Sequence, residues 1–368
     1  MKLRYRIAGG VAGLLVLAMA GLALLLGHTT PCPDARTGSA AGATTMKAIV
    51  YECYGDADVL QLATIDKPVP EADEVLVRIE AAAVNPLDWH YMRGSPYFMR
   101  LGSGLGAPSV TRLGVDFAGV VEAVGAEVSR FQPGDEVFGG RTGAFAEYVT
   151  VREGAAIAKK PANVSFAEAA AVPIAGVTAL QALRDKGGVE RGDTVLINGA
   201  SGGVGTFAVQ IAKALGAEVT GVCSTRNVEL VTNLGADHVV DYKQSDYTGG
   251  AQRYSVIVDN VGNHSVPANR KVLTDEGVLV IIGGPKGDWF TPLLRPMQAA
   301  LLSPFVDQQL SLMIAKMNQG DLEYLGSLME NGSIRPVIDR EFGFNEVADA
   351  IRYSETGRAR GKIIIRVN

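Results

Sequence analysis

The chain has 368 residues, 47% of them hydrophobic, and a formal net charge of −5 at pH 7. A chain of this length can bury a large core and is typical of two domains. Because 34 Lys and Arg face 39 Asp and Glu, with basic residues only in scattered pairs such as Lys159 and Lys160, the charge pattern argues against a nucleic-acid partner.

The chain begins with a segment unlike the rest. Basic residues at positions 2–6 precede residues 7–26, a stretch that is apolar and free of charge. It is long enough to cross a bilayer as a helix, and neither a small-x-small cleavage site nor a lipobox before Cys32 follows it. We therefore predict that residues 1–45 form an uncleaved, single-pass membrane anchor and a flexible linker, with the linker at residues 29–45.

The sequence leaves two alternatives for this segment. The basic residues favour an N-terminus on the cytoplasmic side, which places the body outside, whereas the cofactor predicted below is a cytoplasmic reductant. In the second alternative, translation starts at Met46, where MKAIVYECYG is typical of a natural start, and the protein is cytoplasmic.

Neither the cysteines nor the histidines show the spacing of metal ligands. The cysteines are far apart in sequence and predict neither a Cys-x-x-Cys knuckle nor a disulfide framework, so we interpret all three as packing residues: Cys32, Cys53 and Cys223. The four histidines also lack the spacing of a ligand pair: His28, His90, His238 and His264. Zinc is therefore not expected.

Short apolar strands separated by turn signals follow as far as Thr150. They are expected at residues 47–52, 74–84, 117–125 and 145–151, with a Pro-Gly turn at residues 133–134. This pattern predicts a mostly β domain.

Strands and helices alternate after Phe166. An alanine-rich, helix-compatible stretch at 167–183 contains Pro173, which must lie at an element end or a kink. Five apolar strands are then expected at 193–198, 217–223, 237–242, 254–260 and 277–284, separated by segments of helix length. Such alternation predicts an α/β domain with a doubly wound parallel sheet. A helix near 321–330 and a strand at 361–367 complete the chain.

A glycine cluster follows the strand that ends at Asn198. The pattern Ala200-x-Gly202-x-x-Gly205 leads directly into an amphipathic helix, which is the context of a dinucleotide-binding turn. Gly202 allows backbone amides to approach a pyrophosphate, and Gly205 allows the helix to pack closely on the strand. We predict cofactor contacts at Ala200, Ser201, Gly202, Gly203, Val204 and Gly205. Alternatively, these glycines form a tight strand-to-helix turn that binds no cofactor.

The end of the next strand indicates which dinucleotide binds. An NAD site carries an acidic residue there, whereas this chain has Ser224, Thr225 and Arg226, which suit a 2′-phosphate. NADPH is therefore the predicted cofactor. Alternatively, Arg226 only begins a solvated helix.

The body from Met46 to Asn368 resembles the medium-chain dehydrogenase/reductase superfamily, in its zinc-free quinone oxidoreductase branch similar to zeta-crystallin. The matching pieces occur in the family's order: MKAIVYECYG, VNPLDWHYMRG, GVDFAGVVEAVG, PGDEVFG, GAFAEYV, AAAVPIAGVTALQAL, NGASGGVG and ARGKIIIRV. The resemblance implies a GroES-like catalytic domain at 46–168, completed by 333–368, and a Rossmann NADPH-binding domain at 169–332.

The same resemblance implies positions around the cofactor. Asn85 should lie beside the nicotinamide and Thr178 near its carboxamide. Arg226 and Tyr242 should meet the 2′-phosphate. Four residues should end strands that face the cofactor, although each suits a turn or packing role equally: Asn260, Val261, Ile282 and Gly283.

Zinc-dependent relatives differ at informative positions. They carry a cysteine ligand where this chain has Asn85, and Gly-His-Glu where it has Gly114-Val115-Asp116, and they have a cysteine-rich lobe that is absent here. Without a Lewis acid, alcohol oxidation loses its usual electrophile. Hydride transfer to an electron-poor acceptor, such as a quinone or an α,β-unsaturated carbonyl, is still feasible.

The segment NPLDWHYMRG offers candidates for moving a proton. His90 and Tyr91 are candidate catalytic residues, because a neutral imidazole can donate or accept near pH 7. Alternatively, His90 is a satisfied loop histidine and water protonates the product. The glycine-rich apolar loop at 95–113 is either a wall of the substrate cleft, through Tyr97, Phe98 and Met99, or ordinary packing.

We predict a homodimeric, NADPH-dependent, metal-free oxidoreductase that transfers hydride to a small electrophile, a quinone or an α,β-unsaturated carbonyl. Two alternatives stay open: a zinc-free alcohol dehydrogenase or carbonyl reductase, and an NADPH-binding regulator without turnover.

Overall fold

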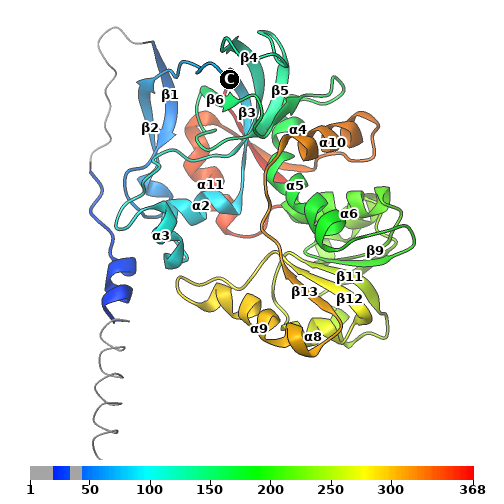
Figure 1. Ribbon diagram of the computed structural model, residues 1–368. Helices are drawn as coiled ribbons and strands as arrows, with labels where there is room; N and C mark the ends of the chain where they lie inside the picture. Colours follow the sequence, from blue (N-terminus) through cyan, green and yellow to red (C-terminus); the bar gives the residue numbers. More distant parts are fainter. Residues whose placement is uncertain (1–19, 34–43) are drawn as a thin grey trace, which may run out of the picture.

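A computed structural model describes residues 20–33 and 44–368, which contain two large sheets with helices packed around them (Figure 1). The first sheet has seven strands in the order β14-β15-β3-β4-β5-β7, and β6 also pairs with β3. A separate pair of strands, β1 (Thr45–Val50) and β2 (Gln61–Asp66), lies in the same half of the body (Figure 1). The strands of the first sheet are β3 (Glu74–Val84), β4 (Asp116–Val124), β5 (Glu136–Gly140), β6 (Tyr148–Arg152), β7 (Ile157–Lys159), β14 (Ile338–Gly343) and β15 (Lys362–Arg366).

The C-terminal strand joins the first sheet. β15 pairs antiparallel with β3, with Ile363 opposite Val84, although the two strands lie at opposite ends of the body sequence. Both strands are buried along most of their length, which fits interior strands of this sheet, but burial alone does not identify the neighbouring strand.

The second sheet is parallel throughout, which confirms the expected doubly wound α/β arrangement. Its order is β10-β9-β8-β11-β12-β13, so the direction of winding reverses between β8 and β11. A ligand crevice is expected at that point, outside the carboxyl ends of the strands. The strands are β8 (Thr194–Asn198), β9 (Glu218–Cys223), β10 (His238–Asp241), β11 (Tyr254–Asp259), β12 (Leu273–Ile281) and β13 (Gln309–Leu312).

Capping residues and prolines define the helix boundaries. Ser165 and Glu168 form a capping box at the start of α4, and Pro173 occupies the first turn of α5, so the alanine-rich stretch forms two helices. The helices are α2 (Pro86–Arg93), α3 (Arg100–Ser103), α4 (Phe166–Ala170), α5 (Pro173–Gln181), α6 (Gly203–Ala214), α7 (Val228–Asn233), α8 (Val266–Arg270), α9 (Leu294–Leu302), α10 (Gln319–Glu330) and α11 (Val347–Glu355).

One apolar core cluster connects the two halves of the body. It runs from Ala81 and Phe138 in the first sheet to Val195 and Ile197 in the second. The alanines of α4 and α5 lie in this cluster, and their small side chains allow the helices to approach the sheet closely. The segment predicted as a loop at 95–113 contains two short helical pieces, residues 97–99 and α3.

The structure corrects the predictions for Cys32 and Cys53, which form a disulfide with their Cα atoms 5.0 Å apart. Residues 28–33 are exposed, but the disulfide and hydrogen bonds attach them to the body, so this part of the predicted flexible linker is held in place. Thr30 bonds through its amide to the Gly106 carbonyl at 2.9 Å, and this contact brings the segment to the body. Sequence spacing could not reveal the pairing, because the docked position of the segment decides which sulfurs meet.

The membrane anchor falls largely outside the described residues. The structure describes its last part as helical, residues 20–27, and says nothing about residues 1–19. Within residues 20–33 and 44–368, no helix combines the length and apolar character that crossing a bilayer requires.

Reducing the Cys32–Cys53 disulfide is expected to make residues 20–33 accessible to protease while the body stays folded. Without the disulfide, the segment depends on a few hydrogen bonds, each contributing about 1 kcal/mol. Limited proteolysis of the oxidised protein and of Cys32→Ser, followed by mass spectrometry, measures this. Cys223→Ser is the control, because Cys223 is free and buried. Equal cleavage in Cys32→Ser and the control would contradict the expectation.

Candidate functional site

A cleft of about 1900 Å³ lies between the two halves of the body, at the carboxyl ends of β8, β11 and β12. Its walls include Asn85 and His90 from the first half and Gly202 and Gly283 from the second. The cleft therefore opens at the point where the winding of the parallel sheet reverses, where dinucleotides bind in folds of this kind.

The glycine turn forms one wall of this cleft. Gly202 is the N-cap of α6, so the helix N-terminus faces the cleft with its unpaired amides. A Cβ added at Gly202 would meet only the Gly199 carbonyl oxygen, at 3.5 Å, whereas one at Gly205 would lie 2.1 Å from the same oxygen. Gly205 is therefore required by helix packing, and Gly202 leaves room beside the turn for a phosphate.

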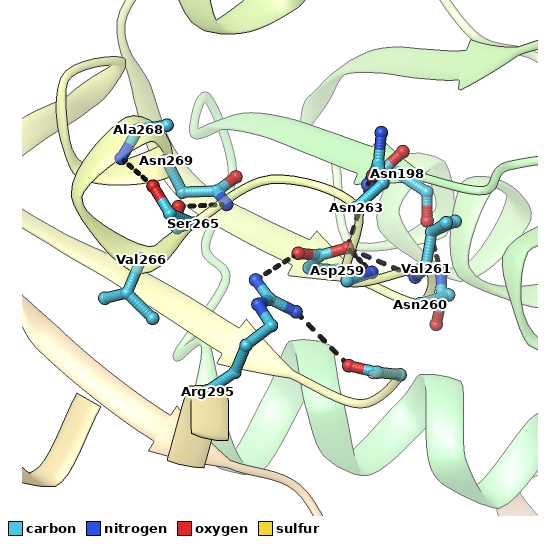
Figure 2. A network of polar contacts seen from close by, with 12 residues as sticks. Asn198, Asp259, Asn260, Val261, Asn263, Ser265, Val266, Ala268, Asn269 and Arg295 are labelled. Atoms are coloured by element: carbon cyan, nitrogen blue, oxygen red, sulfur yellow. Dashed lines mark hydrogen bonds and ion pairs between the residues drawn. The ribbon is translucent and has the colours of Figure 1, made fainter. Parts of the chain in front are cut away.

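A buried ion pair organises the strand ends beneath the turn (Figure 2). The Asp259 carboxylate, which ends β11, accepts from Arg295 Nη2 at 2.5 Å and from the Asn198 amide at 2.8 Å. Its Oδ1 also accepts from the backbone amides of Val261 and Gly262, at 3.1 and 2.9 Å. Arg295 donates in addition to the Gly283 carbonyl at 3.2 Å. These bonds hold the ends of three neighbouring strands in one arrangement.

Two asparagines offer unpaired acceptors at the cleft. Asn227 Oδ1 and Asn260 Oδ1 are buried and have no hydrogen-bond partner among the residues that the structure describes, and both residues line the cleft. Buried acceptors without a donor are rare in folded proteins. These oxygens therefore suit a ligand that brings hydroxyl or amide donors, such as a nucleotide.

Basic groups gather at the end of β9. Arg226 lines the cleft and donates from Nη2 to the Arg358 carbonyl at 2.8 Å, and Arg358 also lines the cleft. Lys243 and Tyr242 lie on the same wall. Three cations and a phenol suit a phosphate. The donor set thus fits NADPH, with the glycine turn for the pyrophosphate and Arg226 for the 2′-phosphate.

The structure places most of the predicted cofactor residues along the cleft. Two lie elsewhere: Ala200 is fully buried, and the Thr225 hydroxyl donates to Asp241 at 2.6 Å. The predicted residues that line the cleft are Asn85, His90, Tyr91, Thr178, Ser201, Gly202, Gly203, Val204, Gly205, Ser224, Arg226, Tyr242, Asn260, Val261, Ile282 and Gly283.

A buried lysine, which sequence reasoning missed, lines the cleft beside Asn85. Lys362 Nζ lies 2.5 Å from Asn85 Oδ1 and 3.3 Å from Asp116 Oδ2. Asn85 Nδ2 in turn donates to Asp116 at 2.9 Å, so the Asn85 amide is fully oriented by its two partners. Burial raises the pKa of Asp116, and the Lys362 charge opposes that rise. The sequence contains one signal for this buried lysine: Lys362 is the first residue of β15 and directly precedes its apolar run.

Asp88 connects Asn85 to Gly114 through two hydrogen bonds. Its carboxylate accepts from the backbone N–H of Asn85 at 2.7 Å and from the backbone N–H of Gly114 at 3.1 Å. Burial nevertheless raises the pKa of Asp88 from its ordinary value of 3.8 to about 7. Because the folded state holds this proton more tightly, the stabilisation from Asp88 is complete below about pH 4 and is lost as the pH rises through about 7.

Asp88→Asn is expected to flatten the pH dependence of stability. Between about pH 4 and pH 7 the wild type loses up to about 1.4 kcal/mol of unfolding free energy per pH unit through this group. Urea unfolding at several pH values measures the slope. Asp307→Asn, at an exposed site, is the control and should keep the wild-type slope. An unchanged slope in Asp88→Asn would show that Asp88 does not titrate in this range.

His90 and Tyr91 lie on the cleft wall with different exposure. Burial lowers the pKa of His90, so its ring is neutral near pH 7. His90 Nδ1 lies 2.6 Å from the Ser95 carbonyl, which only accepts, so Nδ1 carries the hydrogen and Nε2 is an acceptor. Tyr91 is among the exposed aromatic residues. Of the predicted substrate-wall residues, Met99 lines the cleft, whereas Tyr97 and Phe98 do not.

The described residues contain no group of three or more His, Cys, Asp or Glu side chains arranged to hold a metal. At the position where zinc-dependent relatives have a histidine, this chain has Val115, whose side chain has no ligand atom.

Comparisons with known proteins give a consistent result. A family described as an alcohol dehydrogenase GroES-like domain matches residues 71–162, and one described as a zinc-binding dehydrogenase matches residues 234–365. The 2-methylene-furan-3-one reductase of Solanum lycopersicum is 35% identical over 340 residues, covering 87% of this chain and 79% of that protein. The chloroplast envelope quinone oxidoreductase homolog of Arabidopsis thaliana is 34% identical over 340 residues, covering 87% and 98%.

A solved structure shares the same architecture. The quinone oxidoreductase from Coxiella burnetii aligns with a TM-score of 0.78 and 29% identity, over 88% of this chain and 100% of that one.

Proposed function

The chain belongs to the medium-chain dehydrogenase/reductase superfamily, in its quinone oxidoreductase branch, and on this premise we propose that it is an NADPH-dependent oxidoreductase acting on quinones or α,β-unsaturated carbonyls. One observation carries the proposal: the glycine turn after Asn198 lines the same cleft as Asn85 and Lys362. Bound NADPH supplies a hydride, and solvent supplies the proton that completes the reduced acceptor.

The chain's own residues position the reactants. The amides at the start of α6 and the guanidinium of Arg226 hold the phosphates, while the Asp259 network keeps the strand ends in place. Asn85, held by Lys362 and Asp116, forms the rigid wall at the catalytic end. Positioning of this kind contributes much of the rate when hydride moves directly to an electron-poor acceptor.

We propose that the proton comes from water. The neutral His90 ring presents an acceptor at Nε2, so it suits a role in orienting water or substrate better than a role as acid. Hydride addition to a quinone leaves a stabilised phenolate anion, which can take its proton from solvent without a dedicated acid.

We also propose that catalysis needs no zinc. Val115 cannot ligate, and the Asn85 amide is engaged by Lys362 and Asp116. Elemental analysis of the purified protein, with assays in the presence and absence of a chelator, tests this. Stoichiometric zinc with activity lost on chelation would refute it.

An acceptor panel tests the reaction itself. NADPH oxidation is measured with 1,4-benzoquinone, an enal and a simple ketone, and we expect activity with the first two. Activity on the ketone alone would instead identify a carbonyl reductase. NADPH binding without oxidation of any acceptor would identify a regulator.

Arg226→Ala is expected to raise the KM for NADPH by about tenfold or more and to leave the KM for NADH nearly unchanged, because a charge-assisted bond contributes about 1.5–3 kcal/mol. Steady-state kinetics with both cofactors measure the two constants. Arg253→Ala is the control, since the Arg253 side chain donates to the carbonyls of Gly250, Ala251 and Gln252, which lie outside the cleft. Equal rises for NADPH and NADH would contradict a 2′-phosphate contact.

The remaining assignments are also proposals. We propose residues 46–168 with 333–368 as the catalytic domain and 169–332 as the NADPH-binding domain, which the pairing of β15 with β3 supports. A homodimer stays a prediction. We propose that residues 7–26 anchor the protein in a membrane. The disulfide supports a body on the oxidising side, since disulfides persist there and Cys32 precedes Met46. A reporter fused after Asn368 tests the side.

A further inference from the structure

An exposed apolar surface borders the mouth of the cleft, and we call it the apolar rim. Leu24, Leu101 and Phe290 are 76%, 67% and 69% exposed. The rim consists of Leu24, Leu25, Leu101, Leu105, Val110 and Phe290.

Three segments of chain form the rim, and specific contacts hold them together. Arg100, only 3% exposed, donates from Nη1 to the carbonyls of Leu26 and His28 at 2.9 and 2.8 Å. The Tyr97 ring packs edge-on against the Trp289 ring, with centroids 4.8 Å apart. Figure 1 shows the helix of residues 20–27 beside α3. The rim is therefore one fixed surface and not three separate loops.

The rim continues directly into the cleft. Val110 belongs to the rim and also lines the cleft, and Met99 and Asp288 line the cleft from the same two segments of the body. A molecule that enters at this side therefore crosses an apolar border before it reaches the site.

The sequence before the rim indicates what covers it. Residues 7–26 carry no charge, basic residues precede them, and the last of them, including Leu24 and Leu25, lie in the rim. If this stretch enters a bilayer, the surface in which it ends lies at the lipid boundary, since the disulfide and Arg100 fix residues 26–33 to the body. Apolar side chains next to such a segment gain free energy by entering the lipid surface.

We propose that the apolar rim rests in the surface of a lipid bilayer and that the cleft takes its acceptor, a quinone or enal with a long apolar tail, directly from the lipid. This inference rests on the proposed function, whose substrate class it narrows. The tail stays in the lipid along the rim while the electron-poor head enters the cleft.

Full-length protein in phosphatidylcholine and phosphatidylglycerol vesicles tests the proposal. The vesicles hold a quinone with a decaprenyl tail, and 1,4-benzoquinone in solution is the comparison acceptor. The test variant is Leu101→Gln/Leu105→Gln. The matched control is Leu62→Gln/Val69→Gln, at exposed positions of the β domain outside the rim.

We expect the rim variant to oxidise NADPH about tenfold more slowly with the vesicle quinone, because two apolar anchors leave the lipid. Its rate with benzoquinone should stay within about twofold of wild type, as should both rates of the control. A rim variant that keeps the wild-type rate with the vesicle quinone overturns the proposal. If the wild type sediments as a dimer and the rim variant as a monomer, the rim is an interface with a second copy of the chain. That result also overturns the proposal.

A readout independent of turnover separates this proposal from the proposed function. In Trp89→Phe, Trp289 is the remaining tryptophan, and brominated phosphatidylcholine should quench its fluorescence if the rim enters the lipid. Absence of quenching overturns the rim proposal, whatever the activity. If Trp89→Phe is quenched but the wild type reduces neither quinones nor enals, the rim proposal is supported and the proposed function is refuted.

Discussion

Lys362→Met is expected to lower the free energy of unfolding by about 3–5 kcal/mol, because it leaves a buried carboxylate without its cation. Lys362 is 3% exposed and Asp116 is fully buried, and their charged atoms lie 3.3 Å apart. The substitution also removes the donor to Asn85 Oδ1, so the Asn85 amide loses its fixed orientation. We expect kcat to fall by about 100-fold, since catalytic geometry is sensitive to displacements of about 1 Å.

Urea unfolding of the single and double variants measures the electrostatic part. Lys362→Met/Asp116→Asn should recover most of the lost stability, because neither a buried charge nor its partner is then present. Its kcat should stay low, since Asn85 Oδ1 still lacks the hydrogen bond from Lys362 Nζ. A double variant no more stable than Lys362→Met would show that lost packing, and not the unpaired charge, destabilises the protein.

Gly205→Ala is expected to reduce stability and NADPH affinity together. The new Cβ would lie 2.1 Å from the Gly199 carbonyl oxygen and 2.8 Å from backbone atoms of Ala200, so α6 must move away from β8. Overpacking of this kind costs about 1–3 kcal/mol of unfolding free energy. We propose that the N-terminal amides of the same helix bind the pyrophosphate, so we expect the Kd for NADPH to rise by more than about tenfold.

Gly202→Ala separates packing from cofactor contact. Its Cβ would lie 3.5 Å from the Gly199 oxygen, an ordinary contact, so stability should not change. The methyl group would nevertheless occupy the approach to the phosphates and weaken NADPH binding. Thermal unfolding and fluorescence titration with NADPH measure the two effects. If Gly205→Ala matches wild type in both, or if the two variants behave alike, the roles assigned to these glycines are wrong.

Short-range patterns predicted much of the fold. The spacing of apolar strands and helix-length segments predicted the parallel sheet, and the glycine turn after Asn198 predicted the start of α6, because both depend on residues close in sequence. The position of Pro173 was likewise predictable, since a proline fits the first turn of a helix. Resemblance to a family, and not periodicity, indicated that the C-terminal strand belongs with the first half of the body.

The groups that sequence reasoning missed are those that meet across long separations. Lys362 and Asn85 are 277 residues apart and meet only because β15 pairs with β3. Arg226 and the Arg358 carbonyl likewise meet only through the fold, although 132 residues separate them in sequence. The Cys32–Cys53 disulfide also depends on how residues 28–33 lie against the body. The prediction that these cysteines are packing residues was wrong because sequence spacing carries no information about that position.

By itself, the sequence of this protein determined most of the elements, the glycine turn after Asn198 and the apolar stretch at its start, since local backbone preferences and hydrophobic periodicity act over a few residues. Tertiary structure alone decided which charges share the buried site at Asn85, which sulfurs pair, and that an apolar surface borders one side of the entrance to the cleft. Such contacts depend on which elements pack together, and the same local sequence patterns are compatible with other pairings of helices and strands.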